Sequence, residues 1–166
     1  MHEWVDEAVI ELGSQAEWAA WLSENHATET AVWLKVAKKR SGIVTVSCPE
    51  ALDIALRYGW IDGQCGKLDD DYFLQRYSRR RRGSRWSRIN RDRVEVLAAE
   101  GLMFSAGLHE VELAKANGLW DAAYASSKNM VVPDDLAAGL DRDPVAKTTS
   151  HLGLLWVSRS SLTARR

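Results

Sequence analysis

Hydrophobic and polar positions in the first part of the chain follow a helical period and then a strand period. The stretch Ser14–Glu17 is a capping box, so we expect a helix to begin near residue 15. Trp18, Trp21 and Leu22 follow at helical spacing and predict the buried stripe of that helix. Alternation over residues 31–38 predicts a strand with two different faces.

A second turn and a second helix are marked by their end residues. Gly42 indicates a turn, and residues 43–46 predict a short second strand. The stretch Ser47–Glu50 is another capping box, with proline in the first turn. We expect Gly59 to end this helix. The buried stripe of the helix is predicted to consist of Leu52, Ala55 and Leu56.

Two strands over about residues 60–66 and 71–78 follow, and we expect them to pair in antiparallel fashion around the Asp69–Asp71 turn. The rest of the chain is predicted to be mainly helical. We expect one helix to follow residues 84–87 and to end at Gly101, with Ile89, Val96 and Leu97 as its apolar positions. A second is expected over about 105–117, ended by Gly118, and a short third one over 133–140. After Pro144 the pattern degrades.

These elements predict a single-domain α+β fold, with a small antiparallel or mixed β-sheet packed by several helices and a helical C-terminal half. A length of 166 residues fits one domain. We expect the domain to cover residues 1–147 and residues 148–166 to be an atypical, truncated or disordered tail. No stretch has the length of apolar sequence that a membrane span needs, and Met1 is not followed by a secretory signal pattern.

Two cysteines in the chain are too few for a disulfide framework and fit a reducing cytoplasm, where we expect the protein to act. The net charge of −1 hides a strong segregation. Residues 1–30 hold seven acids and no Lys or Arg, whereas residues 76–93 hold nine arginines and one acid. Such asymmetry is typical of an anion-binding face, unless folding pairs the two regions with each other.

Candidate chemistry is concentrated between residues 60 and 90. Alternation places Trp60, Asp62 and Gln64 on one face of their strand. On the next strand, Tyr77 shares a face with Phe73 and Gln75, and Arg76 shares the other with Tyr72 and Leu74. A face that carries tryptophan, carboxylate and amide indicates a pocket wall rather than a half-buried strand.

Arg76 is a candidate partner for Asp62 across this hairpin, in a bidentate ion pair. The alternative is that such a pair only holds the structure together. An adjacent arginine also lowers the pKa of an aspartate, which makes Asp62 a weak general base.

The arginine run continues through Arg79–Arg82, Arg85 and Arg88 into the next helix. Ser84 and Ser87 are candidate N-caps, and free N–H groups at a helix N-terminus favour anions. The alternative is a solvated basic loop, or one that docks on the acidic N-terminal helix. Trp86 is either a packing anchor or a stacking platform, and Asn90 either donates to a ligand or continues the cap.

We expect no metal and no cofactor. The four histidines are scattered, whereas a zinc site needs three or four clustered ligands. The chain contains no P-loop, no GxGxxG and no GxSxG motif.

Taken together, this segment resembles the YdeI/OmpD-associated family of bacterial proteins, also called bacteriocin-protection proteins, over roughly residues 14–145. The resemblance implies a cytoplasmic α+β protein linked to tolerance of bacteriocins or antimicrobial peptides. It implies roles for the polar and aromatic residues of the motif. The residues that carry the resemblance and these roles are Trp60, Asp62, Arg76, Arg80, Ser84, Trp86, Ser87 and Asn90.

The chain departs from the family in two places. Where the family usually carries a loop of the kind T-P-R-R-P, residues 78–83 have arginines in place of both prolines, so the loop is more basic and more flexible. Residues 148–166 do not match the aromatic and basic helices with which the family usually ends. Either the core manages without these helices, or an apolar face is left there for a partner or a second copy of the chain to cover.

The hypothesis that we favour is a ligand-binding protein without chemistry. It would hold a small, partly anionic or aromatic compound, and sequestration of an antimicrobial would be one use. Its ligand-binding residues would be Trp60, Asp62, Gln64, Arg76, Tyr77, Arg80, Ser84, Trp86, Ser87 and Asn90. The alternatives are nucleic-acid binding through residues 76–93, a hydrolase-like enzyme with Asp62 as base, and a protein–protein adaptor. A homodimer through the C-terminal region is a further candidate, and no membrane partner is expected.

Overall fold

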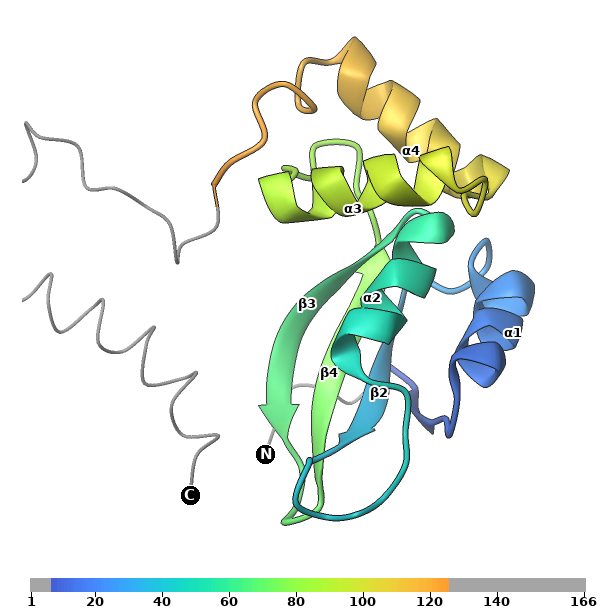
Figure 1. The fold of residues 1–166 in the computed structure, drawn as a ribbon, viewed down its shortest axis with the longest axis vertical. Coiled ribbons are helices and arrows are strands. Elements are labelled where there is room, and N and C mark those ends of the chain that lie inside the picture. Colours follow the sequence, from blue (N-terminus) through green and yellow to red (C-terminus); the bar gives the residue numbers. More distant parts are fainter. Residues whose placement is uncertain (1–6, 126–166) are drawn as a thin grey trace, which may run out of the picture. The chain divides into compact units, whose positions relative to one another are not determined.

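A mixed four-stranded sheet and four helices make up the fold in the computed structural model, which describes residues 7–125 (Figure 1). The α+β class and the single domain predicted from the sequence are confirmed for these residues. The predicted helix over 133–140 and the predicted tail lie outside them. The elements in chain order are β1 (Val9–Glu11), α1 (Gln15–Asn25), β2 (Ala31–Ala37), α2 (Cys48–Arg57), β3 (Trp60–Lys67), β4 (Tyr72–Arg79), α3 (Arg88–Ala99) and α4 (Ser105–Ala116).

The sheet has the strand order β1-β2-β4-β3. β1 runs parallel to β2, whereas β2 and β3 both run antiparallel to β4. The predicted antiparallel pairing of the strands near 60–66 and 71–78 is therefore confirmed, and the sheet is mixed. β2 and β4 are the central strands. β2 is buried on both of its faces, Val32 and Trp33 included.

The helices begin and end where the capping residues predict. Ser14 accepts the N–H of Glu17, and Ser87 accepts the N–H of Asn90. Ser47 and Glu50 form a reciprocal capping box. Left-handed glycines follow the ends of three helices, because this backbone conformation costs glycine no steric penalty. These glycines are Gly59, Gly101 and Gly118.

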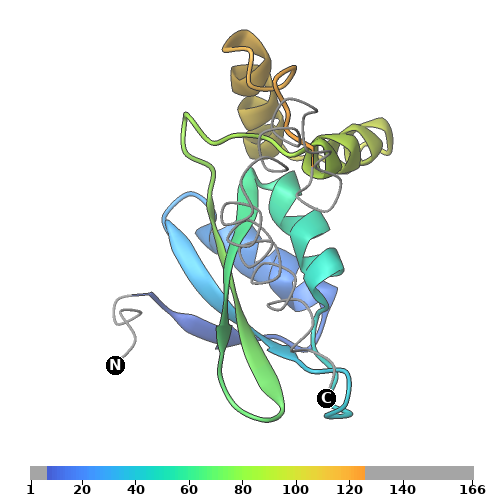
Figure 2. The same cartoon turned by 90° about the vertical axis from the view of Figure 1, so that its left-hand side faces the viewer.

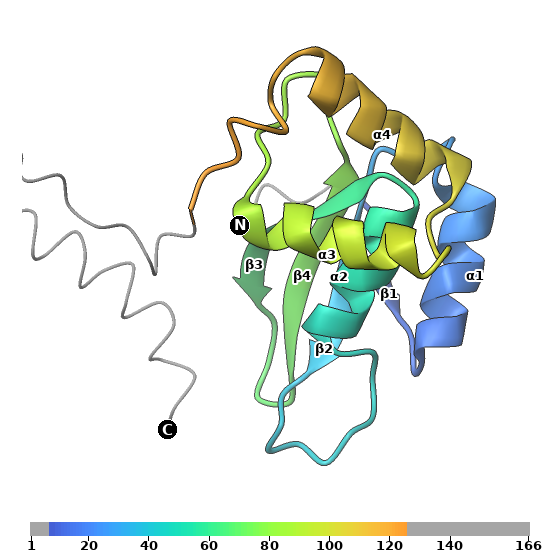
Figure 3. The same ribbon diagram turned by 45° about the horizontal axis from the view of Figure 1, so that its top comes forward.

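Two apolar clusters fill the domain. The first lies between the sheet and the helices α1 and α2, which cover the same face (Figures 1 and 2). It includes Trp18, Leu22 and Trp60, each with no exposed surface. The second cluster centres on Trp86 and Trp120 and lies with α3 and α4 across the end of the sheet where β4 finishes (Figures 1 and 3).

Two local predictions are wrong. Residues 43–46 form no strand, because the Ala37 N–H is bonded to the Thr45 side chain and Val44 stays 80% exposed. In α3, only Leu97 of the predicted apolar positions is buried. Ile89 and Val96 are 51% and 57% exposed, since the helix turns Val94 and Leu97 inward instead. Within residues 7–125, no helix is long and apolar enough to cross a bilayer.

Candidate functional site

Arg80 is the arginine of the basic run that the fold buries. It follows the last residue of β4, and its backbone N–H donates to Gly59 O. The guanidinium lies over the ring of Trp86, 3.5 Å from the ring centre, and Trp86 in turn packs edge-on against Trp120. Only 8% of the Arg80 surface is exposed. The fold thus holds a cation within its second apolar cluster.

The hydrogen bonding of this buried guanidinium is incomplete. Its Nη1 donates to Arg85 O at 3.4 Å, a long contact. Its Nε and Nη2 are shielded from solvent and have no hydrogen-bond partner in residues 7–125. Burial lowers the pKa of Arg80 to about 10, against the attraction of Glu110 and Asp62. The Nε–Nη2 edge, which is the edge that binds a carboxylate in bidentate fashion, is therefore unpartnered.

A small cavity of about 210 Å³ lies beside Arg80. Its walls come from the end of α1, the turn between α2 and β3, the end of β4 and the first turns of α4. The lining residues are His26, Ala27, Tyr58, Gly59, Arg79, Arg80, Ala106, His109 and Glu110. Two arginines, two histidines and one glutamate thus line a space that suits a small polar molecule.

Local contacts fix the walls of this cavity. Gly59 has a φ of +76°, and a Cβ there would lie 2.9 Å from Glu110 Cγ, so α4 closes directly over the turn. Tyr58 stacks on Phe104 at 4.4 Å and packs against His26 at 5.2 Å. His26 Nδ1 lies 2.8 Å from Leu22 O. Since a carbonyl only accepts, Nδ1 carries the proton, which leaves Nε2 free to contact a ligand.

Asp62 lies near this region but outside the cavity lining. Although Asp62 is exposed as a residue, desolvation of its carboxyl by surrounding protein raises its pKa. Its own N–H, Arg80 and the Asn90 side chain oppose that rise. The fold therefore brings Asp62, Arg80 and Asn90 into one neighbourhood, with Trp86 stacked on Arg80.

The predicted pairing of Asp62 with Arg76 is wrong. Asp62 is opposite Tyr77 in the β3–β4 ladder, so Asp62 and Arg76 belong to opposite faces of the sheet. Arg76 instead binds Glu7 through both Nε and Nη2, at 2.7 and 2.5 Å. This contact lowers the pKa of Glu7. The basic run and the acidic N-terminal region are thus paired at this point.

Trp60 and Tyr77 form core rather than a pocket wall. Neither has exposed surface, and Trp60 Nε1 donates to His26 O. Gln64 leaves the face of Asp62 because a bulge lies between Asp62 and Cys65. The buried Gln75 amide holds the bulge by donating to the carbonyls of the bulged residues, Gly63 and Gln64.

Both predicted serines act as local caps. The Ser84 hydroxyl accepts the N–H of Arg81 within the loop, and the Ser87 hydroxyl accepts the N–H of Asn90 at the start of α3. These contacts order the chain on either side of Trp86. They explain the serines without a ligand.

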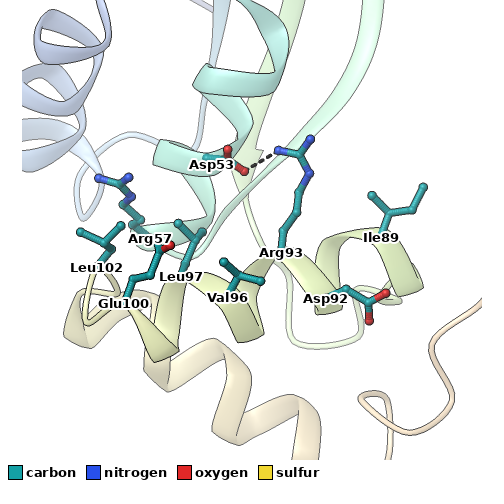
Figure 4. A pocket seen from close by; sticks show the side chains of 9 residues that line it. All are labelled: Asp53, Arg57, Ile89, Asp92, Arg93, Val96, Leu97, Glu100 and Leu102. Atoms are coloured by element: carbon teal, nitrogen blue, oxygen red, sulfur yellow. Dashed lines mark hydrogen bonds and ion pairs between the residues drawn. The ribbon is translucent and has the colours of Figure 1, made fainter.

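A larger and more open depression of about 610 Å³ lies between α2 and α3 (Figure 4). In the figure, Arg93 points across the depression to the Asp53 carboxylate, with which it forms an ion pair. Val96 and Leu97 lie along its floor, and the charged residues Arg57, Asp92 and Glu100 also line it. Arg57 leaves one buried guanidinium nitrogen, Nε, without a hydrogen-bond partner among the described residues, whereas Arg80 leaves two.

Comparison with known protein families finds a match. Residues 10–110 match the family described as Domain of unknown function (DUF8412). The chain belongs to this family. No curated protein and no solved structure matches the chain. The resemblance to YdeI/OmpD-associated proteins is not tested by these comparisons and stays a prediction.

All the residues that line the Arg80 cavity lie within the matched DUF8412 segment, from His26 to Glu110. Of these, the sequence reasoning singled out Arg79 and Arg80. It missed His26, His109 and Glu110 as site residues, because they come from helices far apart in the chain. No local motif marks them. The contribution of α4 to the cavity beside Arg80 follows only from the fold, which brings its first turns against Gly59.

Proposed function

We propose that this protein binds a small molecule with a carboxylate or phosphate group in the cavity beside Arg80. The observation that supports this most strongly is the buried guanidinium edge without a hydrogen-bond partner among the described residues. A buried charge with unpaired donors costs free energy, and a bound anion would remove that cost. Arg79, at the same cavity, adds a second positive charge.

Binding would require the guanidinium to turn this edge toward the cavity. Nε and Nη2 are shielded from solvent, and the contact of Nη1 with Arg85 O at 3.4 Å is the one hydrogen bond that the guanidinium makes within residues 7–125. A small rotation of the side chain would turn the edge toward the cavity while keeping the contact with Trp86. An anion would then be bound in the bidentate geometry that Arg76 and Glu7 already adopt within the same protein.

The size of the cavity limits the ligand. A volume of about 210 Å³ lies below the roughly 300–1,000 Å³ of drug-sized sites, which favours a metabolite or a compact compound. Tolerance of an antimicrobial by sequestration remains our proposal for its use in the cell, on the strength of the family resemblance. The cavity restricts that use to a small compound or a small part of a larger one.

The test is an NMR titration of the whole protein with inorganic phosphate, acetate and succinate. We expect shifts at residues around the cavity for at least one probe, and their loss in Arg80→Met. Arg81→Met is the matched control, since Arg81 is exposed in the same loop. Equal binding by the wild type and Arg80→Met, or no binding of any probe, contradicts the proposal.

Nucleic-acid binding is the second candidate, and one observation favours it. Arg81, Arg82 and Arg85 are exposed, and Arg85 lies 5.8 Å from the half-exposed ring of Tyr124, which would suit a stacked base. Oligonucleotide binding that weakens steeply with salt and is lost in Arg81→Met, but not in Arg80→Met, would support it.

A further inference from the structure

Glu110 is the one carboxylate among the residues that line the Arg80 cavity. Within residues 7–125 its side chain forms no hydrogen bond and no ion pair, and it lies too far from Arg80 for a salt bridge. It is nevertheless near enough to stabilise the Arg80 charge. Two residues of opposite charge therefore line the same small cavity without an ion pair between them.

Close backbone packing, rather than a polar partner, brings Glu110 to the cavity. Its Cγ lies 2.9 Å from the point that a Cβ at Gly59 would occupy. A Cβ at Gly107, one turn earlier in α4, would lie 2.4 Å from Arg57 O. These two approaches hold the first turns of α4 against the end of α2. Glu110 is thus held at the cavity without being neutralised.

From this arrangement we infer that the ligand is a zwitterion of the α-amino acid class. Its carboxylate would bind the free edge of Arg80, and its ammonium would donate to Glu110. The inference rests on the anion site proposed above. A simple anion would meet the repulsion of Glu110, whereas an amino acid satisfies both charges at once.

Size and lining agree with this class. An α-amino acid of small or medium side chain fits within about 210 Å³. The ring of Tyr58 and the methyl group of Ala106 supply the apolar part of the wall. The imidazole of His26 lies against Tyr58 and adds a polar contact with a free Nε2.

The experiment compares amino acids with their des-amino analogues on the full-length protein by NMR titration. The probe pairs are L-alanine with propionate, L-leucine with 4-methylpentanoate, and L-phenylalanine with 3-phenylpropionate. We expect at least one amino acid to bind about tenfold more tightly than its analogue, as one added charged hydrogen bond would give. In Glu110→Gln that preference should disappear, while the analogue binds as well as before or better.

Glu112→Gln is the matched control, because Glu112 is exposed on the same helix and pairs with Lys115. It should keep the preference. If the analogues bind as tightly as the amino acids and Glu110→Gln strengthens both, the zwitterion inference fails and the anion site stands. If neither class binds the wild type, the zwitterion inference fails, whereas the proposed function fails only if phosphate, acetate and succinate do not bind either.

Discussion

Arg76 and Arg80 lie four residues apart at the end of one strand, yet the fold treats them in opposite ways. Arg76 is on the sheet face away from α1 and α2, and both atoms of its Nε–Nη2 edge bind Glu7. Arg80 lies past the strand end, stacked on Trp86, with the same edge unpartnered among residues 7–125. The Nε–Nη2 edge of Arg76 thus already has its hydrogen-bond acceptors within the protein. The same edge of Arg80 still lacks an acceptor among these residues.

The difference shows how to separate a structural arginine from a binding one. The sequence predicts a binding role for Arg76 as strongly as for Arg80, since both belong to the basic run. What distinguishes them in the structure is whether the Nε–Nη2 edge of the guanidinium has a hydrogen-bond acceptor. A saturated edge favours stability, whereas an unsatisfied buried edge favours binding at some cost to stability.

The largest effect should come from removing the platform under Arg80. Trp86→Ala deletes a buried indole that contacts both Arg80 and Trp120, so we expect a loss of about 3–5 kcal/mol in the free energy of unfolding. Urea unfolding followed by far-UV circular dichroism measures it. A loss below about 1 kcal/mol would show that Trp86 does not anchor this end of the domain.

The same substitution at the two arginines should act with opposite sign. Arg76→Met breaks a bidentate pair and leaves Glu7 alone, for a loss of up to about 1 kcal/mol. Arg80→Met removes a buried cation with unpaired donors, so stability should stay unchanged or rise by up to about 1 kcal/mol. Urea unfolding of both variants checks this. An equal loss in the two would remove the distinction between them.

The smallest expected effect is the pH dependence of the stability that the Glu7–Arg76 pair contributes. Arg76 lowers the pKa of Glu7 below its ordinary value of 4.5, so the pair stabilises the fold above that pH. The contribution, below about 1 kcal/mol, is lost as pH falls through the lowered pKa. The stability difference between wild type and Glu7→Gln should be constant near pH 7 and shrink below about pH 4.5. A difference that grows on acidification would contradict this.

The helices could be predicted because their signals are local. Ser14, Ser47 and Ser87 cap three of them, and each cap lies within four residues of the group that it binds. Gly59 adopts the left-handed conformation just after α2, and a glycine at such a position indicates the end of a helix directly from the sequence. The antiparallel pairing of β3 with β4 also follows from proximity along the chain.

The site could be predicted only in part, because its contacts are long-range. Arg76 finds Glu7 across 69 residues, and nothing near either residue indicates the pair. The bulge between Asp62 and Cys65, which the sequence analysis did not predict, moves Gln64 away from Asp62. Trp60 was interpreted as a pocket wall because a strand pattern does not reveal the helices packed above it.

The close approach at Gly107 has a consequence for the cavity beside Arg80. Because a side chain at this position would collide with the carbonyls of Leu56 and Arg57, any residue larger than glycine would push α4 away from the end of α2. The wall that carries His109 and Glu110 belongs to α4 and would move with it. Occupancy of the cavity should slow amide exchange in α4 more than in β2, which links ligand binding to the local opening of the domain.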